Sequence, residues 1–236
     1  MTIKNALDVI KNAQDARLIV FDWDGTLFDS TGVIAHSLQQ ACLAVNVRVP
    51  STAQAKFVIG LSLDEVVAQL VGDVDSAQRE AFMLAYRRTY LGSEHLVRLY
   101  DGIEPLLVQL RALGKTLCIA TGKSRAGLDR ILQHNPDFAG LFDQTRTADQ
   151  TQSKPHPQML HELMAACDVS AAHTVMVGDT TYDVEMAHNA GVRSIALAYG
   201  AHDAATLMAS NPSCFAHDVA QLATLLRGND VLSVTT

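Results

Sequence analysis

The sequence predicts an α/β protein in which a Rossmann-like, mostly parallel sheet carries helices on both faces and an all-helical insertion follows the first strand. Apolar runs alternate with helix-spaced segments from residue 100 onward, which is typical of a parallel sheet. The apolar run 18–21 is rich in β-branched and aromatic residues and predicts a buried strand. Residues 30–98 show helical spacing only. We therefore expect a core of residues 1–28 and 100–236, with a helical insertion at residues 29–99.

Composition limits the class of protein. The chain has 236 residues, of which 48% are hydrophobic and 18% charged, which is typical of a globular protein with a buried core. Its net charge of -7 disfavours a nucleic-acid partner, because binding to nucleic acid depends on attraction to phosphates. Its 4 scattered cysteines favour small core residues over a disulfide or zinc site. No stretch is typical of a secretory signal or a membrane helix, so we expect a cytoplasmic protein. We expect it to be a monomer or a homodimer.

The first hundred residues are expected to be mainly helical on both sides of the first strand. An apolar periodicity at residues 3–10 predicts a short helix before that strand. After the strand, Asp29 or Ser30 can cap a helix that runs to about residue 45. Further helices are expected after the candidate N-cap Ser51, over residues 63–71, and from Asp73 or Asp75 through Tyr90.

Strands and helices are expected to alternate beyond residue 100. The expected strands cover residues 116–120, 141–146, 174–177, 194–198 and 214–216. The expected helices cover residues 103–113 and 124–134, a segment starting at Pro155, a segment ending at Gly191, and residues 203–209 and 218–227. The carboxyl ends of parallel strands meet at one edge of a sheet, and ligands bind at that edge in open α/β folds.

Polar side chains follow three of the expected strands at this edge. The first strand is followed by Asp22 and Asp24, the second by Thr121, and the strand at 174–177 by Asp179 and Asp183. Carboxylates that gather at one place repel one another unless a cation lies between them. Because oxygen ligands of this kind suit Mg²⁺, the pattern predicts a magnesium site.

A lysine at the same edge favours binding of a phosphate. Lys154 stands just before an expected helix, where its cation can act beside the hydroxyl of Thr121 and backbone amides at turns such as Gly122. The stretch Gly122-Lys123-Ser124 is not a nucleotide-binding P-loop. That motif requires glycine five residues before Gly122, where this chain has Leu117.

These residues together resemble the motifs of a known family. Four ordered motifs of the haloacid dehalogenase superfamily are similar to Asp22-Trp23-Asp24-Gly25-Thr26-Leu27, Thr121, Lys154-Pro155 and Gly178-Asp179-Thr180-Thr181-Tyr182-Asp183. The helical insertion between the first two motifs resembles the small helical cap of that family. The chain looks like the phosphoglycolate-phosphatase-like branch. The resemblance implies Mg²⁺-dependent hydrolysis of a small phosphorylated metabolite, a phosphate monoester.

The resemblance also implies a role for each matched residue. Asp22 resembles the nucleophile that forms an aspartyl-phosphate, and Asp24 resembles the general acid and base. The expected metal ligands are Asp22, Asp24 through its backbone carbonyl, Asp179, and Asp183 either directly or behind a direct ligand. The phosphoryl oxygens are expected to contact Thr121, Gly122 and Lys154.

Two other functions stay open at this point: a sugar phosphomutase of the β-phosphoglucomutase type, and a catalytically silent binding module. Such mutases tend to carry a small apolar residue where this chain has Thr26. A silent module would have lost a catalytic residue, yet every matched position is present. Phosphatase is therefore the favoured interpretation.

Substrate choice is expected to depend on the cap. Lys56, Arg87 and Arg88 are candidates for meeting a second anionic group of the substrate, although solvated surface side chains are the commoner case. The chain crosses between cap and core near residues 29 and 99, and two crossings favour hinge motion.

Overall fold

The computed structural model describes residues 14–72 and 74–227. The helix expected at residues 3–10 and the candidate cap Asp73 lie outside the described residues. Across the part of the chain that is described, no helix combines the length and the apolar character that a membrane crossing requires.

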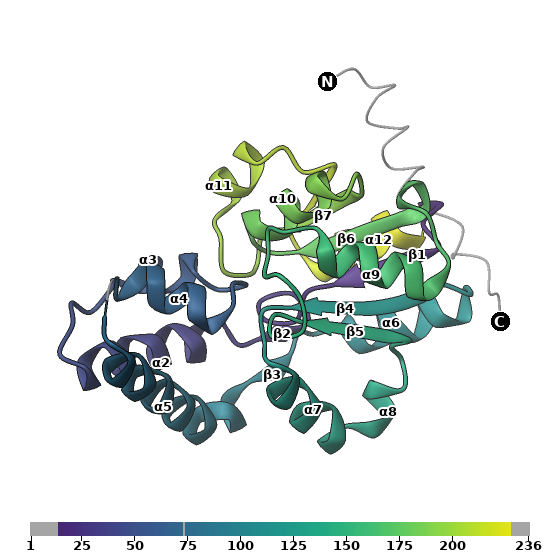
Figure 1. The fold of residues 1–236 in the computed structure, drawn as a ribbon. Helices are drawn as coiled ribbons and strands as arrows, with labels where there is room; N and C mark the ends of the chain where they lie inside the picture. The colour runs from purple at the N-terminus through teal and green to yellow at the C-terminus, as the bar shows by residue number, and fades with distance from the viewer. Residues whose placement is uncertain (1–13, 73, 228–236) are drawn as a thin grey trace.

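The main sheet has six parallel strands in the order β5-β4-β1-β6-β7-β8 (Figure 1). Its strands are β1 (Leu18–Phe21), β4 (Thr116–Thr121), β5 (Gln144–Thr147), β6 (Thr174–Gly178), β7 (Arg193–Leu197) and β8 (Cys214–Ala216). The central strand β1 pairs Phe21 with Ile119 of β4 and with Val177 of β6. This register brings the carboxyl ends of the three strands to one edge, as the sequence predicted.

Helices cover both faces of the sheet because side chains on β1 alternate between two hydrophobic clusters. Ile19 and Phe21 pack in the cluster with α6 (Ile103–Ala112), α7 (Arg125–His134), α8 (Pro136–Ala139) and α12 (Val219–Arg227). Leu18 and Val20 pack in the cluster with α9 (Gln158–Cys167) and α10 (Thr181–Asn189). A smaller cluster holds α11 (Ala204–Ala209) against β7 and α10. The predicted Rossmann-like α/β fold is confirmed.

Two core elements begin later than the sequence indicated. The helix expected from Pro155 is α9, which begins at Gln158 with Pro157 as its N-cap. Proline disfavours helical conformation in the residue before it, so Pro157 excludes His156 from the helix. The strand expected from residue 141 begins at Gln144. The preceding Leu141 and Phe142 instead bond back to α8 and pack against the first core cluster.

The helical insertion, which we call the cap, gathers to one side of the sheet in Figure 1. It contains α2 (Thr31–Ala44), α3 (Thr52–Phe57), α4 (Leu63–Leu70), α5 (Ser76–Ser93) and the 3₁₀ turn η1 (Glu94–Leu96). The four α-helices share a hydrophobic cluster that includes Leu38, Val67 and Phe82. The chain enters and leaves the cap through β2 (Phe28–Asp29) and β3 (Arg98–Leu99), which pair as an antiparallel ribbon.

Candidate active site

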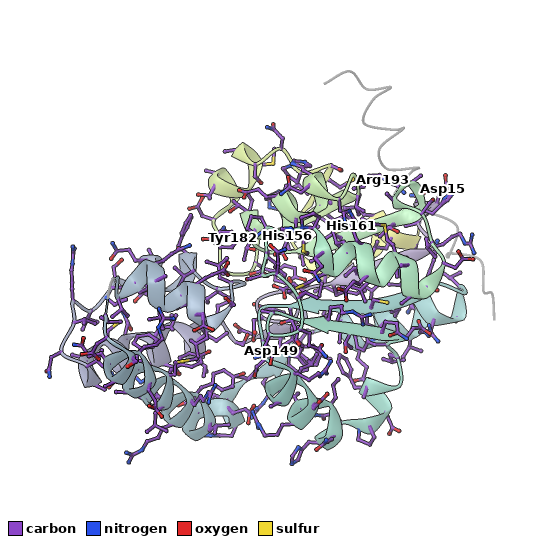
Figure 2. The ribbon with its side chains drawn as sticks, viewed as in Figure 1. Asp15, Asp149, His156, His161, Tyr182 and Arg193 are labelled. Atoms are coloured by element: carbon purple, nitrogen blue, oxygen red, sulfur yellow. The ribbon has the colours of Figure 1, made fainter. Side chains whose placement is uncertain are left out.

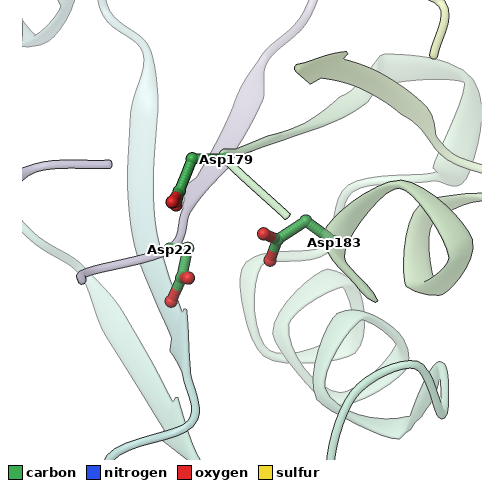
Figure 3. Close-up of side chains that lie close together, drawn as sticks. All are labelled: Asp22, Asp179 and Asp183. Carbon is green, nitrogen blue, oxygen red and sulfur yellow. The ribbon is translucent and has the colours of Figure 1, made fainter. Parts of the chain in front are cut away.

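Three carboxylates converge at the carboxyl edge of the sheet (Figure 3). Asp22, Asp179 and Asp183 each offer an oxygen within 4.8 Å of the others, and no more than 1% of any of the three residues is exposed. Asp22 follows β1, Asp179 follows β6, and Asp183 lies in the first turn of α10. The structure thus brings together three of the four aspartates that the sequence singled out.

Two glycines are required by the close approach of these carboxylates. Gly25 has φ +78°, and a Cβ there would lie 2.1 Å from Asp179 Oδ2. A Cβ on Gly178 would lie 2.2 Å from Asp183 Cγ. Any side chain at either position would displace a carboxylate, so the glycines of the first and fourth motifs serve the geometry of the site.

Hydrogen bonds fix the orientation of two of the carboxylates. Asp179 accepts hydrogen bonds from Thr26 Oγ1 at 2.7 Å and from the backbone N–H of Ala201 at 2.7 Å. Asp183 Oδ2 accepts from Thr180 Oγ1 at 2.7 Å and from the Thr180 backbone N–H at 3.1 Å. Asp22 Oδ2, by contrast, is buried without a hydrogen-bond partner among the described residues.

Lys154 provides a positive charge inside this cluster. Its Nζ lies 2.8 Å from Asp22 Oδ1 and 2.7 Å from Asp183 Oδ1, and its side chain is 0% exposed. Burial opposes the ammonium charge, but Asp183 and Asp22 together raise the Lys154 pKa above its ordinary value. Lys154 thus lies at the same edge of the sheet as the carboxylates, and its expected contact with phosphoryl oxygens stays a prediction.

The site still holds more negative charge than Lys154 balances. Burial raises the pKa of Asp22 well above its ordinary value, although Lys154 opposes the shift. Burial and the nearby Asp183 raise the pKa of Asp179 to about 7. A bound cation would relieve both effects.

The donor set fits Mg²⁺ as the sequence predicted. The three converging side chains supply oxygen ligands only, which is the ligand class that Mg²⁺ prefers. The buried, unpartnered Asp22 Oδ2 is the acceptor that a cation would satisfy. Asp22, Asp179 and Asp183 are therefore the side chains that would hold the ion.

Asp24 directs its carboxylate away from this cluster. Its Oδ1 accepts a hydrogen bond from Ser30 Oγ at 2.7 Å, and its Oδ2 lies 3.0 Å from Lys123 Nζ. The expectation that Asp24 reaches the metal through its backbone carbonyl stays a prediction. Its side-chain oxygens bond to Ser30 and Lys123 and are not part of the carboxylate cluster.

The expected phosphate-binding positions lie beside the cap. Thr121 ends β4, is 0% exposed, and accepts a hydrogen bond from the Lys123 backbone N–H at 3.2 Å. A Cβ on Gly122 would lie 2.6 Å from the carbonyl oxygens of Gly60 and Leu61 in the turn between α3 and α4. Gly122 therefore lets the cap approach the phosphate-binding edge closely.

A histidine joins the cap to the loops that carry the carboxylates. His202 Nδ1 accepts a hydrogen bond from the Thr181 backbone N–H at 3.0 Å, so its other nitrogen, Nε2, donates to the Phe57 carbonyl at 2.9 Å. The Phe57 and His202 rings stack with centroids 4.6 Å apart. Tyr182, labelled in Figure 2, packs its edge against both rings.

Sequence reasoning missed several residues of this site, and two of its candidates for a substrate contact are exposed in the structure. Arg87 and Arg88 are exposed on α5, whereas Tyr86 and Tyr90 of the same helix face the core. The missed residues are Thr26, Ser30, Lys123, Tyr90 and His202. The spacing of Phe82, Tyr86 and Tyr90 was the available signal, because it places both tyrosines on the buried stripe of the helix.

A parallel sheet with a buried carboxylate cluster at its carboxyl edge, and a helical cap above it, defines the haloacid dehalogenase-like class of proteins. Comparison of sequences agrees with this geometry. The chain belongs to the haloacid dehalogenase-like hydrolase family, whose sequence model matches residues 19–197.

Individual relatives and solved structures lead to the same class. The chain is 30% identical to a phosphoglycolate phosphatase from Vibrio parahaemolyticus, over 89% of this chain and 95% of that protein. A crystal structure described as a predicted phosphoglycolate phosphatase from Haemophilus somnus superposes with a TM-score of 0.74 at 25% identity, covering 89% of this chain and 98% of the other.

A candidate β-phosphoglucomutase from Bacteroides vulgatus superposes with a TM-score of 0.82 at 19% identity, covering 94% of this chain and 96% of the other, and shows the shared fold alone. The family model and the phosphoglycolate phosphatase relatives confirm the predicted class, which is a phosphatase of the phosphoglycolate-phosphatase-like branch.

Proposed function

We propose that this protein hydrolyses a small phosphate monoester in a Mg²⁺-dependent reaction that passes through an aspartyl-phosphate on Asp22. The observation that carries the proposal is the state of Asp22. Its carboxylate is buried at the end of β1, one oxygen lies 2.8 Å from Lys154 Nζ, and the other has no hydrogen-bond partner among the described residues. When one oxygen of this carboxylate binds the cation, the other is available to attack phosphorus.

The surrounding side chains supply the remaining requirements of the first step. The Thr121 hydroxyl, the Gly122 backbone N–H and the Lys154 ammonium hold the phosphoryl oxygens and stabilise the charge that develops on them. An Asp22 oxygen forms a bond to phosphorus while the bond from phosphorus to the ester oxygen breaks. Asp24 gives its proton to the departing oxygen.

The second step regenerates the enzyme. Asp24, now ionised, takes a proton from a water molecule, and the water oxygen attacks the phosphorus of the aspartyl-phosphate. The bond between phosphorus and Asp22 breaks, so inorganic phosphate leaves and Asp22 is again a carboxylate. Mg²⁺, when bound by Asp22, Asp179 and Asp183, would offset the repulsion between the anionic nucleophile and the anionic phosphate.

Phosphoglycolate is the first substrate to test, because the name of a relative at 30% identity refers to that ester. The cap packs against the core at Gly122 and at His202, which favours a leaving group small enough to be enclosed between the two parts. A small phosphorylated metabolite is therefore the proposed partner.

The experiment is a panel of phosphate esters incubated with enzyme and Mg²⁺ while inorganic phosphate is measured. We expect release from phosphoglycolate or another small monoester. Asp22→Asn is expected to abolish turnover while circular dichroism shows a folded protein, because the amide cannot act as the nucleophile. Turnover of an aryl phosphate by Asp22→Asn at the wild-type rate would contradict the proposal.

Asp24→Asn provides the matched comparison. It removes the acid and base but keeps the nucleophile, so we expect a rate lower by about 10²–10⁴-fold. Some phosphoenzyme is expected to form from aryl phosphates, whose leaving groups depart without a proton. Absence of any phosphoenzyme in this variant would contradict the separate roles of the two aspartates.

A further inference from the structure

Lys123 is a second lysine of the site, and neither the metal cluster nor the phosphate-binding set requires it. Its side chain is 11% exposed, and its Nζ lies 3.0 Å from Asp24 Oδ2. Burial opposes the ammonium charge, but Asp24 and the neighbouring tyrosines raise the Lys123 pKa above its ordinary value. A charged, nearly buried lysine thus stands directly beside the proposed acid and base.

The Lys123 ammonium, which contacts Asp24 of the core, also contacts a residue of the cap. Lys123 Nζ donates a hydrogen bond to Tyr90 Oη at 3.2 Å and lies 4.9 Å from the centroid of the Tyr90 ring. Tyr90 is on α5, is 8% exposed, and stacks with Tyr86 at a centroid distance of 6.1 Å. Lys123 itself follows β4, so its side chain joins a carboxylate of the core to a phenol of the cap.

The second oxygen of Asp24 is also held at the boundary of the cap. Ser30 Oγ donates a hydrogen bond of 2.7 Å to Asp24 Oδ1, and Ser30 is the N-cap residue of α2, the first helix of the cap. Both Asp24 oxygens therefore have partners whose positions depend on where the cap lies. Among the described residues, loss of Lys123 would leave the Asp24 side chain with Ser30 as its remaining partner.

We propose that Lys123 is a positioning residue through which closure of the cap fixes the carboxylate of Asp24; the proposal rests on the function proposed above. With the cap closed, Tyr90 holds the ammonium and the ammonium holds Asp24 Oδ2. With the cap open, Tyr90 withdraws and the long lysine side chain regains its conformational freedom. Protonation of the leaving group and activation of water are thereby confined to the closed state, in which the site is enclosed.

A second ion pair between core and cap provides a control, because it holds the cap to the core without contacting Asp24. Arg130 of α7 and Glu94 of η1 form a bidentate pair, with Arg130 Nη2 at 2.6 Å from Glu94 Oε1. Among the contacts of the described residues, neither of these side chains bonds to Asp24. Arg130→Met therefore weakens docking of the cap without removing a partner of Asp24.

The test compares Lys123→Met, Lys123→Arg and Arg130→Met on phosphoglycolate and on 4-nitrophenyl phosphate, with the rate of the first turnover measured in each case. Release of an alkoxide requires a proton from Asp24, whereas release of 4-nitrophenolate does not. We expect Lys123→Met to slow the first turnover of phosphoglycolate by about 10²-fold, which is the cost of misplacing a catalytic group by about an ångström. We expect much less effect on 4-nitrophenyl phosphate.

Lys123→Arg is expected to recover part of the lost rate because it keeps the charge. Arg130→Met is expected to raise KM for both esters by the same factor without a preference for either leaving group. Equal losses on the two esters in Lys123→Met would overturn the positioning role. So would a loss of the same size and pattern in Arg130→Met.

Small-angle scattering of the metal-free protein supplies a measurement that does not depend on activity. We expect Lys123→Met and Tyr90→Phe to be more extended than the wild type, and unchanged scattering in both would overturn the link between Lys123 and the cap. If the wild type released no phosphate from any ester, the proposed function would fail and the role toward Asp24 with it. The scattering would still decide whether Lys123 joins the cap to the core.

Discussion

Lys154 Nζ lies 2.8 Å from Asp22 Oδ1, and both side chains are fully enclosed by the protein. The same ammonium contacts Asp183, so one lysine serves two carboxylates. A buried charge that loses its partner is costly, because desolvation is no longer offset by attraction. The stability of the site therefore depends on the balance between the Lys154 ammonium and the carboxylates around it.

Removal of Lys154 is expected to destabilise the metal-free protein. Lys154→Met leaves Asp22 and Asp183 without their cation, and breaking a buried pair by removing one partner costs about 3–5 kcal/mol. Urea unfolding in the presence of a chelator measures the change. Lys56→Met is the control because Lys56, in α3 of the cap, forms no ion pair with any described residue, and we expect it to lower stability by less than about 0.5 kcal/mol. Equal stability of the two variants would contradict the assigned charge balance.

Magnesium is expected to be essential for turnover and to stabilise the fold. Asp22, Asp179 and Asp183 provide oxygen ligands at one point, and a ligand that binds only the native state raises its stability. Excess chelator is expected to abolish phosphate release, and Mg²⁺ is expected to raise the thermal midpoint. Ca²⁺ is expected to support little turnover, since its larger and looser coordination misplaces the nucleophile. Full activity in excess chelator would contradict the metal site.

A methyl group at position 200 is expected to weaken metal binding. The Cβ of Gly200→Ala would lie 2.1 Å from Asp179 Oδ2, so the carboxylate must shift. We expect the Mg²⁺ concentration for half-maximal activity to rise by about 10–100-fold, the usual effect of disturbing groups that orient a ligand. The thermal midpoint, followed as Mg²⁺ is added, gives the same comparison without turnover.

Gly92→Ala is the matched control for this substitution. Gly92 lies in α5, and a Cβ there would meet nothing within 4 Å. We expect its Mg²⁺ dependence to equal that of the wild type and its stability to rise by about 0.5–1 kcal/mol, because alanine favours a helix interior. An unchanged Mg²⁺ requirement in Gly200→Ala would show that Asp179 does not bind the ion.

The sequence predicted the sheet and the carboxylate cluster because both depend on local patterns. The apolar run Leu18–Phe21, rich in β-branched and aromatic residues, predicted a buried strand, and the residues after it were then expected at the edge of the sheet. Gly25, with φ +78°, allows the turn after β1, and Gly178 leaves the space that the Asp183 carboxylate occupies. The alternation of strands and helices predicted a mostly parallel sheet, whereas the strand order β5-β4-β1-β6-β7-β8 became known only from the structure.

Lys123, Ser30 and His202 could not be recognised in the same way because their roles arise between distant segments. Lys123 contacts Asp24 and Tyr90, which come from β1's loop and from α5. In the sequence it is one lysine among several, and a solvated side chain is the more frequent case. His202 follows β7, where nothing local indicates that its partner is the carbonyl of Phe57 in the cap.

The exposure of Arg87 and Arg88 has a different origin, which is the phase of a helix. A residue at one position of α5 shares its face with residues three and four positions away. Phe82, Tyr86 and Tyr90 form the buried stripe, so the two arginines between them face solvent. Their charge made the two arginines candidates for a substrate contact, and that role stays a prediction.

The last prediction separates a phosphatase from a sugar phosphomutase. Thr26, where mutases of the β-phosphoglucomutase type tend to carry a small apolar residue, donates a hydrogen bond of 2.7 Å to Asp179 Oδ1. A mutase must shield its aspartyl-phosphate from water until a sugar hydroxyl takes the phosphoryl group, whereas a phosphatase lets Asp24 activate water. We expect one inorganic phosphate for each small monoester consumed. β-Glucose 1-phosphate with a catalytic amount of the bisphosphate is expected to yield little glucose 6-phosphate. If glucose 6-phosphate accumulated faster than inorganic phosphate, the protein would be assigned as a mutase and not as a phosphatase.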